Sequence, residues 1–431
     1  MTRPLGAAHA IAAALLFSAH LFRAGHLPAA LATALFPLLL LWRTRWVLRT
    51  MQAAFLAASA EWLRTGLTLA LDRASVGAPY LRMVFILGAV SGFTALGALL
   101  LERQRERYPR HDATIASLGA ITVAAALLIP VQGFVRMDMV LLERFFPGGG
   151  WVELGLVLLY TGWIAERLVE NSRLWRGRLW TLFSAVFFLQ LLLGLGGLDR
   201  FLQTGQLHLP VPALIIAGPL YRGEGLFMPI LFLSTIALAG PIWCSHLCYI
   251  GAWDHASSTA VSRPEVPGRW RPWGRVFTLA LVVVGALTLR GLGVRTPIAA
   301  AAGGAFGLIG VAIMLLVSRK KGYMAHCTAW CPVGLVAITL GRLNPFRVTL
   351  GGSCTQCGAC TPVCRYDALR PEHLAGGQVG SSCTLCGDCV QRCPRSQLQY
   401  RFLRWQGEGV RIAFVALAAA LHAVFLTLAR I

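Results

Sequence analysis

The sequence predicts a mainly α-helical protein, a polytopic membrane bundle of about eleven spans with one small cysteine-rich domain inserted near its C-terminal end. Hydrophobic residues make up 56% of the chain and charged residues only 13%, and the mean hydropathy is +0.64. Long apolar runs recur along the whole chain. All 12 cysteines fall in closely spaced groups, which indicates metal or redox sites and not a disulfide framework.

The apolar runs are long enough, or nearly so, to cross the ~30 Å hydrocarbon layer of a membrane. They are 5–22, 27–42, 51–71, 82–101, 114–133, 152–168, 179–198, 226–249, 275–290, 298–318 and 411–430. The second and ninth runs are short, so the count can change by one or two. Glu61 and Arg64 make the third run either a functional span or an interfacial helix. Residues 199–225, with two proline-containing segments, are expected to form a structured, partly re-entrant cover.

Arginines and lysines concentrate in alternate loops, and positive loops stay on the cytoplasmic side. With the N-terminus inside, the inner segments hold Arg3, Arg43, Arg45, Arg49, Arg103, Arg105, Arg107, Arg110, Arg167, Arg173, Arg176, Arg178, Arg263, Arg269, Arg271 and the basic residues of 319–410. We therefore expect the cysteine-rich domain to face the cytoplasm. The net charge of +21 is spread between apolar runs, which favours an anionic membrane surface as partner and not nucleic acid.

Eight cysteines between residues 354 and 393 repeat the spacing C-x2-C-x2-C-x3-C. Three thiolates at three-residue steps can bind three corners of a cuboidal iron–sulfur cluster, while the fourth cysteine binds the neighbouring cluster. A zinc ribbon is the alternative, but its cysteines come in separated pairs. We predict two [4Fe-4S] clusters in a bacterial-type ferredoxin domain. The first is held by Cys354, Cys357, Cys360 and Cys393, and the second by Cys383, Cys386, Cys389 and Cys364.

Two further pairs share a C-x3-C spacing, Cys244 with Cys248 and Cys327 with Cys331. Residues i and i+4 share one face of an α-helix, so each pair can direct two sulfurs to one point. Both pairs end inward-running spans on the side of the ferredoxin domain. They could hold an additional iron or iron–sulfur centre, form two redox-active dithiols, or simply pack. The neighbouring His246 and His326 could be ligands, proton carriers or hydrogen-bond donors to ligands, although a lone histidine is more often structural.

The paired C-x3-C motifs, the segment CTAWCPVG and the cluster motifs CTQCGACTPVC and CTLCGDCVQRCP resemble the membrane polyferredoxins of the NapH/NosR type. The resemblance covers about residues 226–400. It departs from the family at Tyr249, where a proline is usual, and Arg365 replaces the proline that Pro394 provides in the second cluster motif. Residues 1–200 show no such resemblance. The family consists of bacterial inner-membrane subunits that exchange electrons with the quinone pool through cytoplasmic ferredoxin domains.

The predicted domains are a membrane bundle (1–225), a membrane domain with the paired C-x3-C motifs (226–343), the ferredoxin-like domain (344–400) and an anchor helix (401–431). The expected function is electron transfer between the quinone pool and redox partners within a larger complex. The expected partners are membrane lipid, quinone or quinol, and other electron-transfer subunits such as a cytochrome or an iron–sulfur protein. If the chain is enzymatic, it is a quinol dehydrogenase or oxidoreductase subunit.

Two other classes of function stay open. One is a regulatory or maturation factor that delivers reducing equivalents to another metalloprotein, and the other is a redox-driven transporter subunit. A quinone site is expected among polar residues in or near the spans, which are costly in lipid and often functional. These residues are Glu61, Arg64, Gln132, Arg136, Asp138, Gln190 and His208.

Overall fold

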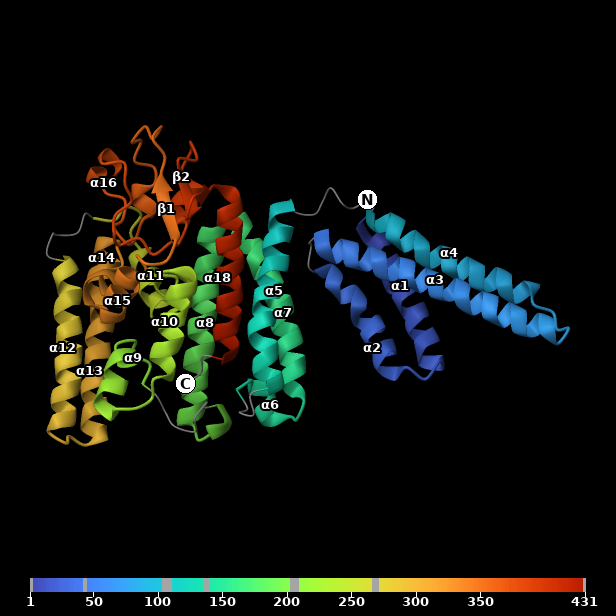
Figure 1. Ribbon diagram of the computed structural model, residues 1–431, viewed down its shortest axis with the longest axis horizontal. Coiled ribbons are helices and arrows are strands. Elements are labelled where there is room, and N and C mark those ends of the chain that lie inside the picture. The colour runs from blue at the N-terminus through green and yellow to red at the C-terminus, as the bar shows by residue number, and fades with distance from the viewer. Residues whose placement is uncertain are drawn as a thin grey trace. The chain divides into compact units, whose positions relative to one another are not determined.

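The computed structural model describes residues 3–41, 45–102, 111–134, 139–201, 209–265 and 271–428. The chain is mainly helical and divides into two compact units, Met1–Thr114 and Ile115–Ile431 (Figure 1). Arg136, Asp138 and His208 lie outside the described residues, and so do Arg43, Arg269 and the basic segment 103–110. All the cysteines belong to the second unit.

The first unit is built on a hairpin of two long helices. Its elements are α1 (Arg3–Arg23), α2 (Leu27–Leu35), the 3-10 segment η1 (Phe36–Leu41), α3 (Arg45–Ser75) and α4 (Leu81–Glu102). The hydroxyls of Ser59 and Ser91 lie 2.8 Å apart and join α3 to α4. Small and apolar side chains from α1, α3 and α4, among them Ala13, Met51 and Leu101, form its core. Hydrophobic packing thus holds this unit together. Buried polar contacts also join its longest helices, including the hydrogen bond from the Gln52 side chain to the Ala98 carbonyl at 3.2 Å.

The second unit is a helical bundle that carries the ferredoxin domain. Its membrane part contains α5 (His111–Phe134), α6 (Leu141–Phe145), α7 (Gly149–Glu170), α8 (Ser172–Leu195), η3 (Asp199–Phe201), α9 (Leu214–Arg222), α10 (Phe227–Ala239), η4 (Trp243–Leu247), α11 (Gly251–Ser258), α12 (Arg271–Gly291), α13 (Thr296–Ile313), η5 (Met314–Ser318), α14 (Arg319–Lys321), η6 (His326–Trp330), α15 (Pro332–Leu340) and α18 (Glu408–Leu428). The α9 helix, which lies within the predicted cover of residues 199–225, packs against α12.

Six helices in the described ranges are long and apolar enough to cross a membrane, and together they fit a membrane protein. They are Leu81–Leu101, Asp112–Gly133, Ser172–Leu195, Trp273–Gly291, Thr296–Lys321 and Glu408–Leu428. The expected count of about eleven is not confirmed. Gly240 and Pro241 end α10 after 13 residues, a length of roughly 20 Å at 1.5 Å per residue. The α7 helix is long enough but carries Glu153, Glu166 and Arg167.

The last helix, α18, lies inside the bundle. Buried residues make up 72% of its apolar window, compared with 11% for Thr296–Lys321, so α18 is surrounded by protein whereas α13 faces outward. It packs against α7 and against β2 (Leu398–Phe402), directly below the ferredoxin domain (Figure 1). The expected C-terminal anchor helix is therefore a central packing element of this unit.

The ferredoxin domain is closed by a small antiparallel sheet. Strand β1 (Phe346–Leu350) pairs with β2, and β2 pairs with β3 (Trp405–Gln406). Phe346 faces Phe402 in the register, and Leu350 faces Leu398. Between the strands lie the cluster loops, with the short helical segments η7 (Thr361–Val363), α16 (Pro371–Ala375) and α17 (Asp388–Arg392). The Tyr400 ring stacks on Phe414 of α18, with centroids 4.9 Å apart, so the sheet is packed onto the membrane bundle.

Candidate functional site

The eight cysteines of the ferredoxin domain come together in two sets. In each set one cysteine, Cys360 in the first and Cys389 in the second, lies near the other three. Cys360 lies close to Cys354, Cys357 and Cys393, whereas Cys389 lies close to Cys364, Cys383 and Cys386. The last cysteine of each sequence motif therefore lies with the first three cysteines of the other. These are the two sets that the motif spacing predicts.

The two cluster loops have the same backbone conformation. Gln356 and Leu385, each one residue before the second cysteine of its motif, have φ values of 53° and 61°. The glycines that follow those cysteines, Gly358 and Gly387, are also left-handed. A left-handed non-glycine residue costs roughly 1–2 kcal/mol, so its occurrence at equivalent positions indicates that the loop shape is required. At Gly387 an added Cβ would also lie 2.6 Å from the Tyr400 hydroxyl.

Equivalent backbone amides donate hydrogen bonds to two of the cysteine sulfurs. The Ala368 amide donates to Cys364 Sγ at 3.2 Å, and the Gln397 amide donates to Cys393 Sγ at 3.3 Å. Such N–H···S contacts stabilise negative charge on the sulfurs and raise the reduction potential of a bound cluster. The folded loops therefore supply both sulfur ligands and preorganised donors.

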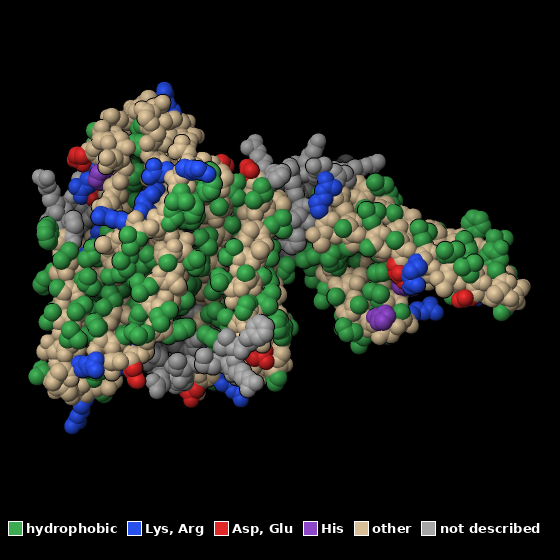
Figure 2. All heavy atoms as spheres, viewed as in Figure 1, with side chains coloured by type: hydrophobic (Ala, Val, Ile, Leu, Met, Phe, Trp, Pro, Cys, Tyr) green, Lys and Arg blue, Asp and Glu red, His purple; other side chains and the backbone are tan. Residues whose placement is uncertain are grey.

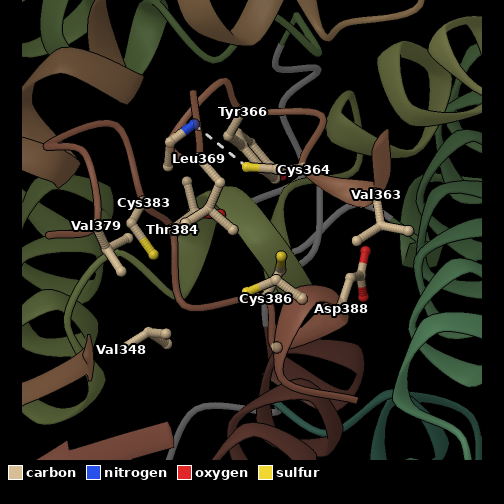
Figure 3. Close-up of a pocket in the computed structure, with 13 residues that line it drawn as sticks. Val348, Val363, Cys364, Tyr366, Leu369, Val379, Cys383, Thr384, Cys386 and Asp388 are labelled. Atoms are coloured by element: carbon tan, nitrogen blue, oxygen red, sulfur yellow. Dashed lines mark hydrogen bonds between the residues drawn. The ribbon is translucent and has the colours of Figure 1, made fainter. Parts of the chain in front are cut away.

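A pocket with a mainly apolar lining separates the sulfurs of the second set (Figure 3). Cys364, Cys383 and Cys386 project around it, with Val348, Val379 and other aliphatic side chains between them. Burial raises the pKa of these three thiols to about 12. Iron binds the deprotonated thiolate form of cysteine. Burial keeps these thiols protonated, so we expect them to lose their protons only when a cationic centre binds. Four sulfur donors around an apolar pocket fit an iron–sulfur cluster.

A buried ion pair joins the second set to a membrane helix. Arg176 of α8 is 1% exposed and pairs with Asp388, which lies between Cys386 and Cys389 in sequence and is 4% exposed. The Arg176 Nε donates to Asp388 Oδ1 at 3.2 Å. The backbone amide of Ser172 donates to Gln391 Oε1 at 3.0 Å, which adds a second contact between α8 and α17. The positive-inside count included Arg176, but the sequence offered no signal for its partner.

Arg365 is a second residue whose role only the structure reveals. It stands where the second motif has Pro394, and its guanidinium reaches into the membrane part of the unit. It donates to the carbonyls of Gly322 at 2.5 Å and Val261 at 2.9 Å. The amide of Met324 in turn donates to the Arg365 carbonyl at 3.0 Å. The departure from proline therefore gives the first cluster loop a side chain that anchors the domain to the bundle.

The two C-x3-C pairs are brought together as well. Cys327 lies within electrostatic contact of Cys244, Cys248 and Cys331. The expectation of an ordinary α-helical i, i+4 face is wrong, because η4 and η6 are π-helical turns. Each turn closes with a hydrogen bond from the amide of its second cysteine, Cys248 to Trp243 at 3.0 Å and Cys331 to His326 at 2.8 Å. The wider turn and an extended residue at its end orient the sulfurs.

Two buried charged residues border this four-cysteine site, defined here as Cys244, Cys248, Cys327 and Cys331. Asp254 of α11 is fully buried, and it accepts hydrogen bonds from the Cys327 amide at 2.9 Å and from the Ser318 hydroxyl at 2.6 Å. Arg275 of α12 is 5% exposed and interacts electrostatically with Cys244, Cys327 and Cys331. The site therefore combines four thiols with one buried cation and one buried carboxyl group.

The remaining candidate residues do not form a common site. Glu61 and Arg64 pair with each other at 2.7 Å on α3, in the first unit. Gln132 donates to Glu143 at 2.9 Å near the start of α7, and Gln190 is buried on α8. His246 shares a 2.8 Å hydrogen bond with the neighbouring Ser245 hydroxyl. In the described ranges, these side chains are accounted for by local pairing or packing.

The spacing of the cysteines also bears on the kind of centre they could hold. Within the described part of the chain, no three His, Cys, Asp or Glu side chains lie close enough to hold a single metal ion. The four ligands of one tetrahedral ion with bonds of ~2.3 Å lie only about 4 Å apart, whereas a cuboidal cluster presents a different iron to each thiolate. The two groups of four cysteines in the ferredoxin domain match the arrangement in which each thiolate binds a different iron.

Comparison with known families identifies one part of the chain. Residues 353–398 match a family model for a 4Fe-4S dicluster domain. The comparisons with curated proteins and with solved structures found no match. The chain therefore contains a 4Fe-4S dicluster ferredoxin domain near its C-terminus, together with several helices that fit a membrane protein.

Proposed function

We propose that this chain is an integral membrane electron-transfer subunit that passes electrons between the quinone pool and redox partners through iron–sulfur clusters. The packing around Tyr366 is the observation that carries this proposal. The Tyr366 hydroxyl donates to the Cys244 carbonyl at 2.5 Å. Tyr366, Trp180 and Met324 belong to one buried group that packs against both Cys327 and Cys386. Continuous contact thus leads from the four-cysteine site at the membrane helices to the dicluster domain, and such positioning is what a protein contributes to electron transfer.

The proposal assigns two [4Fe-4S] clusters with crossed ligation to the ferredoxin domain. The first takes Cys354, Cys357, Cys360 and Cys393, and the second takes Cys364, Cys383, Cys386 and Cys389. The grouping of the thiols and the repeated left-handed loops support this assignment. When bound, the clusters supply one-electron chemistry. The chain supplies the amide donors and the buried Arg176, which favour the reduced state, and apolar surroundings that exclude water.

The four-cysteine site is proposed to hold an additional iron–sulfur or iron centre. Arg275 supports this assignment because its buried Nε has no hydrogen-bond partner among the described residues. A buried guanidinium without an anion is costly, and a thiolate-ligated centre would supply the negative charge it lacks. Two redox-active dithiols or plain packing are the competing interpretations.

The proposed location is a bacterial inner membrane, with the ferredoxin domain on the cytoplasmic side. Figure 2 shows hydrophobic side chains over the helices of the second unit and a concentration of Lys and Arg where these helices meet the ferredoxin domain. The short α14 helix at this level consists of Arg319, Lys320 and Lys321. Basic residues at one end of the spans agree with the positive-inside pattern. Membrane lipid and other electron-transfer subunits, such as a cytochrome or an iron–sulfur protein, are the proposed partners.

Rapid mixing of the purified chain with a quinol tests the proposed function. The full-length protein in detergent is assayed for iron and sulfide, and its clusters are followed by electron paramagnetic resonance. We expect reduction by dithionite to yield cluster signals, and a quinol analogue to reduce the same signals rapidly. Clusters that dithionite reduces but the quinol does not would favour a maturation or regulatory factor. The control is protein with its clusters removed by chelation, which should give no signal with either reductant.

A further inference from the structure

A cavity of about 280 Å³ lies next to the four-cysteine site, within the second unit. Its walls come from α8, α11, α13, η6 and residues 209–213. Apolar groups form nearly all of the lining, including Phe188, Val211, Trp253 and Phe306. Cys331 and Pro332 form the wall shared with the four-cysteine site. The cavity is thus an apolar chamber with one redox-capable wall, at the lower end of the size range of small-molecule sites.

The cavity reaches the outward surface of the helical bundle. Leu308 of α13 belongs to its lining and is 71% exposed. The α13 helix is the least buried of the candidate spans in the described ranges, at 11%. One side of the cavity is therefore bounded by the candidate span that is most open to its surroundings. The geometry therefore admits a ligand that dissolves in the membrane.

His326 provides the cavity's main polar group. The side chain is 6% exposed and lines the cavity, and no residue of the described ranges forms a hydrogen bond with its Nδ1. Gly310 makes room for the ring, since an added Cβ there would lie 2.7 Å from Cε1 and Nδ1. In its neutral form an imidazole has one N–H donor and one acceptor nitrogen. The Gly310 backbone is a polar neighbour of the ring. The buried Nδ1, which has no hydrogen-bond partner in the described ranges, is a nitrogen that a ligand oxygen could satisfy.

We propose that this cavity binds the head group of a quinone or quinol, with His326 forming a hydrogen bond to one ring oxygen. This inference rests on the proposed membrane electron transfer. A substituted ring with two polar oxygens matches an apolar chamber that offers one hydrogen-bonding group. A lipid acyl chain has no polar atom that could form a hydrogen bond with His326. The aromatic walls provide faces for the ring, with Phe188 and Trp253 centroids 4.9 Å apart. Cys331 in the wall places the bound ring beside the four-cysteine site.

The redox step that such a site supports is balanced. A quinol that becomes a quinone loses two electrons and two protons. The iron–sulfur centres of the proposed chain of carriers are the oxidant, each accepting one electron at a time, and the protons leave with solvent. In the opposite direction the reduced centres supply the electrons. The chain's own residues bind and orient the ring and keep it next to the first acceptor.

Gly304 offers a test that blocks the cavity without disturbing the four-cysteine site. It lines the cavity, and a Cβ added there would meet no atom within 4 Å. Gly304→Leu should fill the space a head group needs and weaken binding of decylubiquinone more than about tenfold, by steric exclusion. His326→Leu should weaken it by up to about tenfold, the value of one hydrogen bond. Gly285→Leu is the matched control, because Gly285 of α12 is equally open and does not line the cavity.

Binding is measured on the full-length protein in detergent by quenching of tryptophan fluorescence, and quinol-driven cluster reduction is measured in parallel. Retained iron content and dithionite-reduced spectra show that each variant is folded. Loss of binding and of quinol-driven reduction in Gly304→Leu and His326→Leu, but not in Gly285→Leu, supports the site. If the wild type is reduced by quinol and both cavity variants behave as the wild type does, the cavity assignment is overturned while the proposed function stands. A wild type that neither binds nor is reduced overturns both.

Discussion

Arg176 of α8 and Asp388 of α17 form a buried ion pair between a candidate membrane span and the loop that carries the second set of cysteines. Arg176 also lies within electrostatic contact of Cys386 and 4.9 Å from the centroid of the Trp180 ring. The pair therefore joins the two parts of the second unit mechanically and places a buried positive charge beside the proposed second cluster. Reduction adds an electron to a cluster, so a nearby cation should make reduction easier.

Arg176→Gln should lower the reduction potential of the second cluster, on the order of 50 mV, because it removes a buried charge close to the sulfurs. It should also destabilise the chain by about 3–5 kcal/mol, since Asp388 is left buried and unpaired. Redox titration followed by electron paramagnetic resonance measures the potential. Arg178→Gln is the control, because Arg178 lies on the same helix with an exposed side chain. An unchanged potential in Arg176→Gln, with both clusters intact, would contradict the electrostatic role.

Cys364→Ala and Cys393→Ala form a reciprocal pair of variants. Because Cys364 lies with Cys383, Cys386 and Cys389, its loss should damage the second cluster and spare the first. Loss of Cys393 should do the opposite. The two cluster signals in the reduced spectra report the outcome. Damage by each variant to the cluster of its own sequence motif would show that ligation is not crossed.

Replacing all four residues of the four-cysteine site with serine should lower the iron content of the chain while the two ferredoxin signals persist. It should also slow quinol-driven reduction of those signals, because the intermediate carrier is missing. Iron analysis and stopped-flow absorbance provide the two measurements. If the iron content and the rate of quinol-driven reduction are both unchanged, the four cysteines have only a packing role. Unchanged iron with loss of reversible thiol oxidation would instead identify dithiols.

Arg365→Ala should loosen the ferredoxin domain from the membrane helices. The side chain donates to carbonyls at Val261 and Gly322, and buried carbonyls left without a donor cost about 1–3 kcal/mol each. Faster hydrogen exchange at 322–326 and around Cys364 is the expected result. Arg395→Ala changes an exposed arginine elsewhere in the domain and should leave exchange unaltered. If hydrogen exchange is the same in both variants, Arg365 does not anchor the domain to the membrane helices.

A reporter that is active only in the cytoplasm, fused after Tyr400, should be active. The expectation rests on the positive-inside pattern of 319–410. A periplasm-dependent reporter fused at the same residue serves as the reciprocal measurement. Strong activity of that second reporter would reverse the proposed topology.

The cysteine spacing alone was sufficient to predict a dicluster ferredoxin domain, and the match of residues 353–398 confirms the domain. Three of the four ligands of a cuboidal cluster come from one short loop, so their spacing can be recognised in a short sequence motif. Apolar runs likewise indicate membrane helices, because lipid imposes a length and a composition. The number of spans was less predictable. Hydropathy does not show that α10 ends early at Gly240 and Pro241.

Only the tertiary structure decided which residues meet across long separations. Arg176 and Asp388 lie 212 residues apart in sequence, and Tyr366 reaches Cys244 across 122 residues. No local pattern encodes such partners, since they depend on how α8, η4 and the cluster loops pack. The same holds for the cavity, because the sequence places His326 beside Cys327 but does not show which residues of α8, α11 and α13 surround it. The sequence by itself therefore determined the cysteine motifs and the apolar helices. The arrangement of α8, α12 and α13 around the cysteines was decided by packing in the tertiary structure.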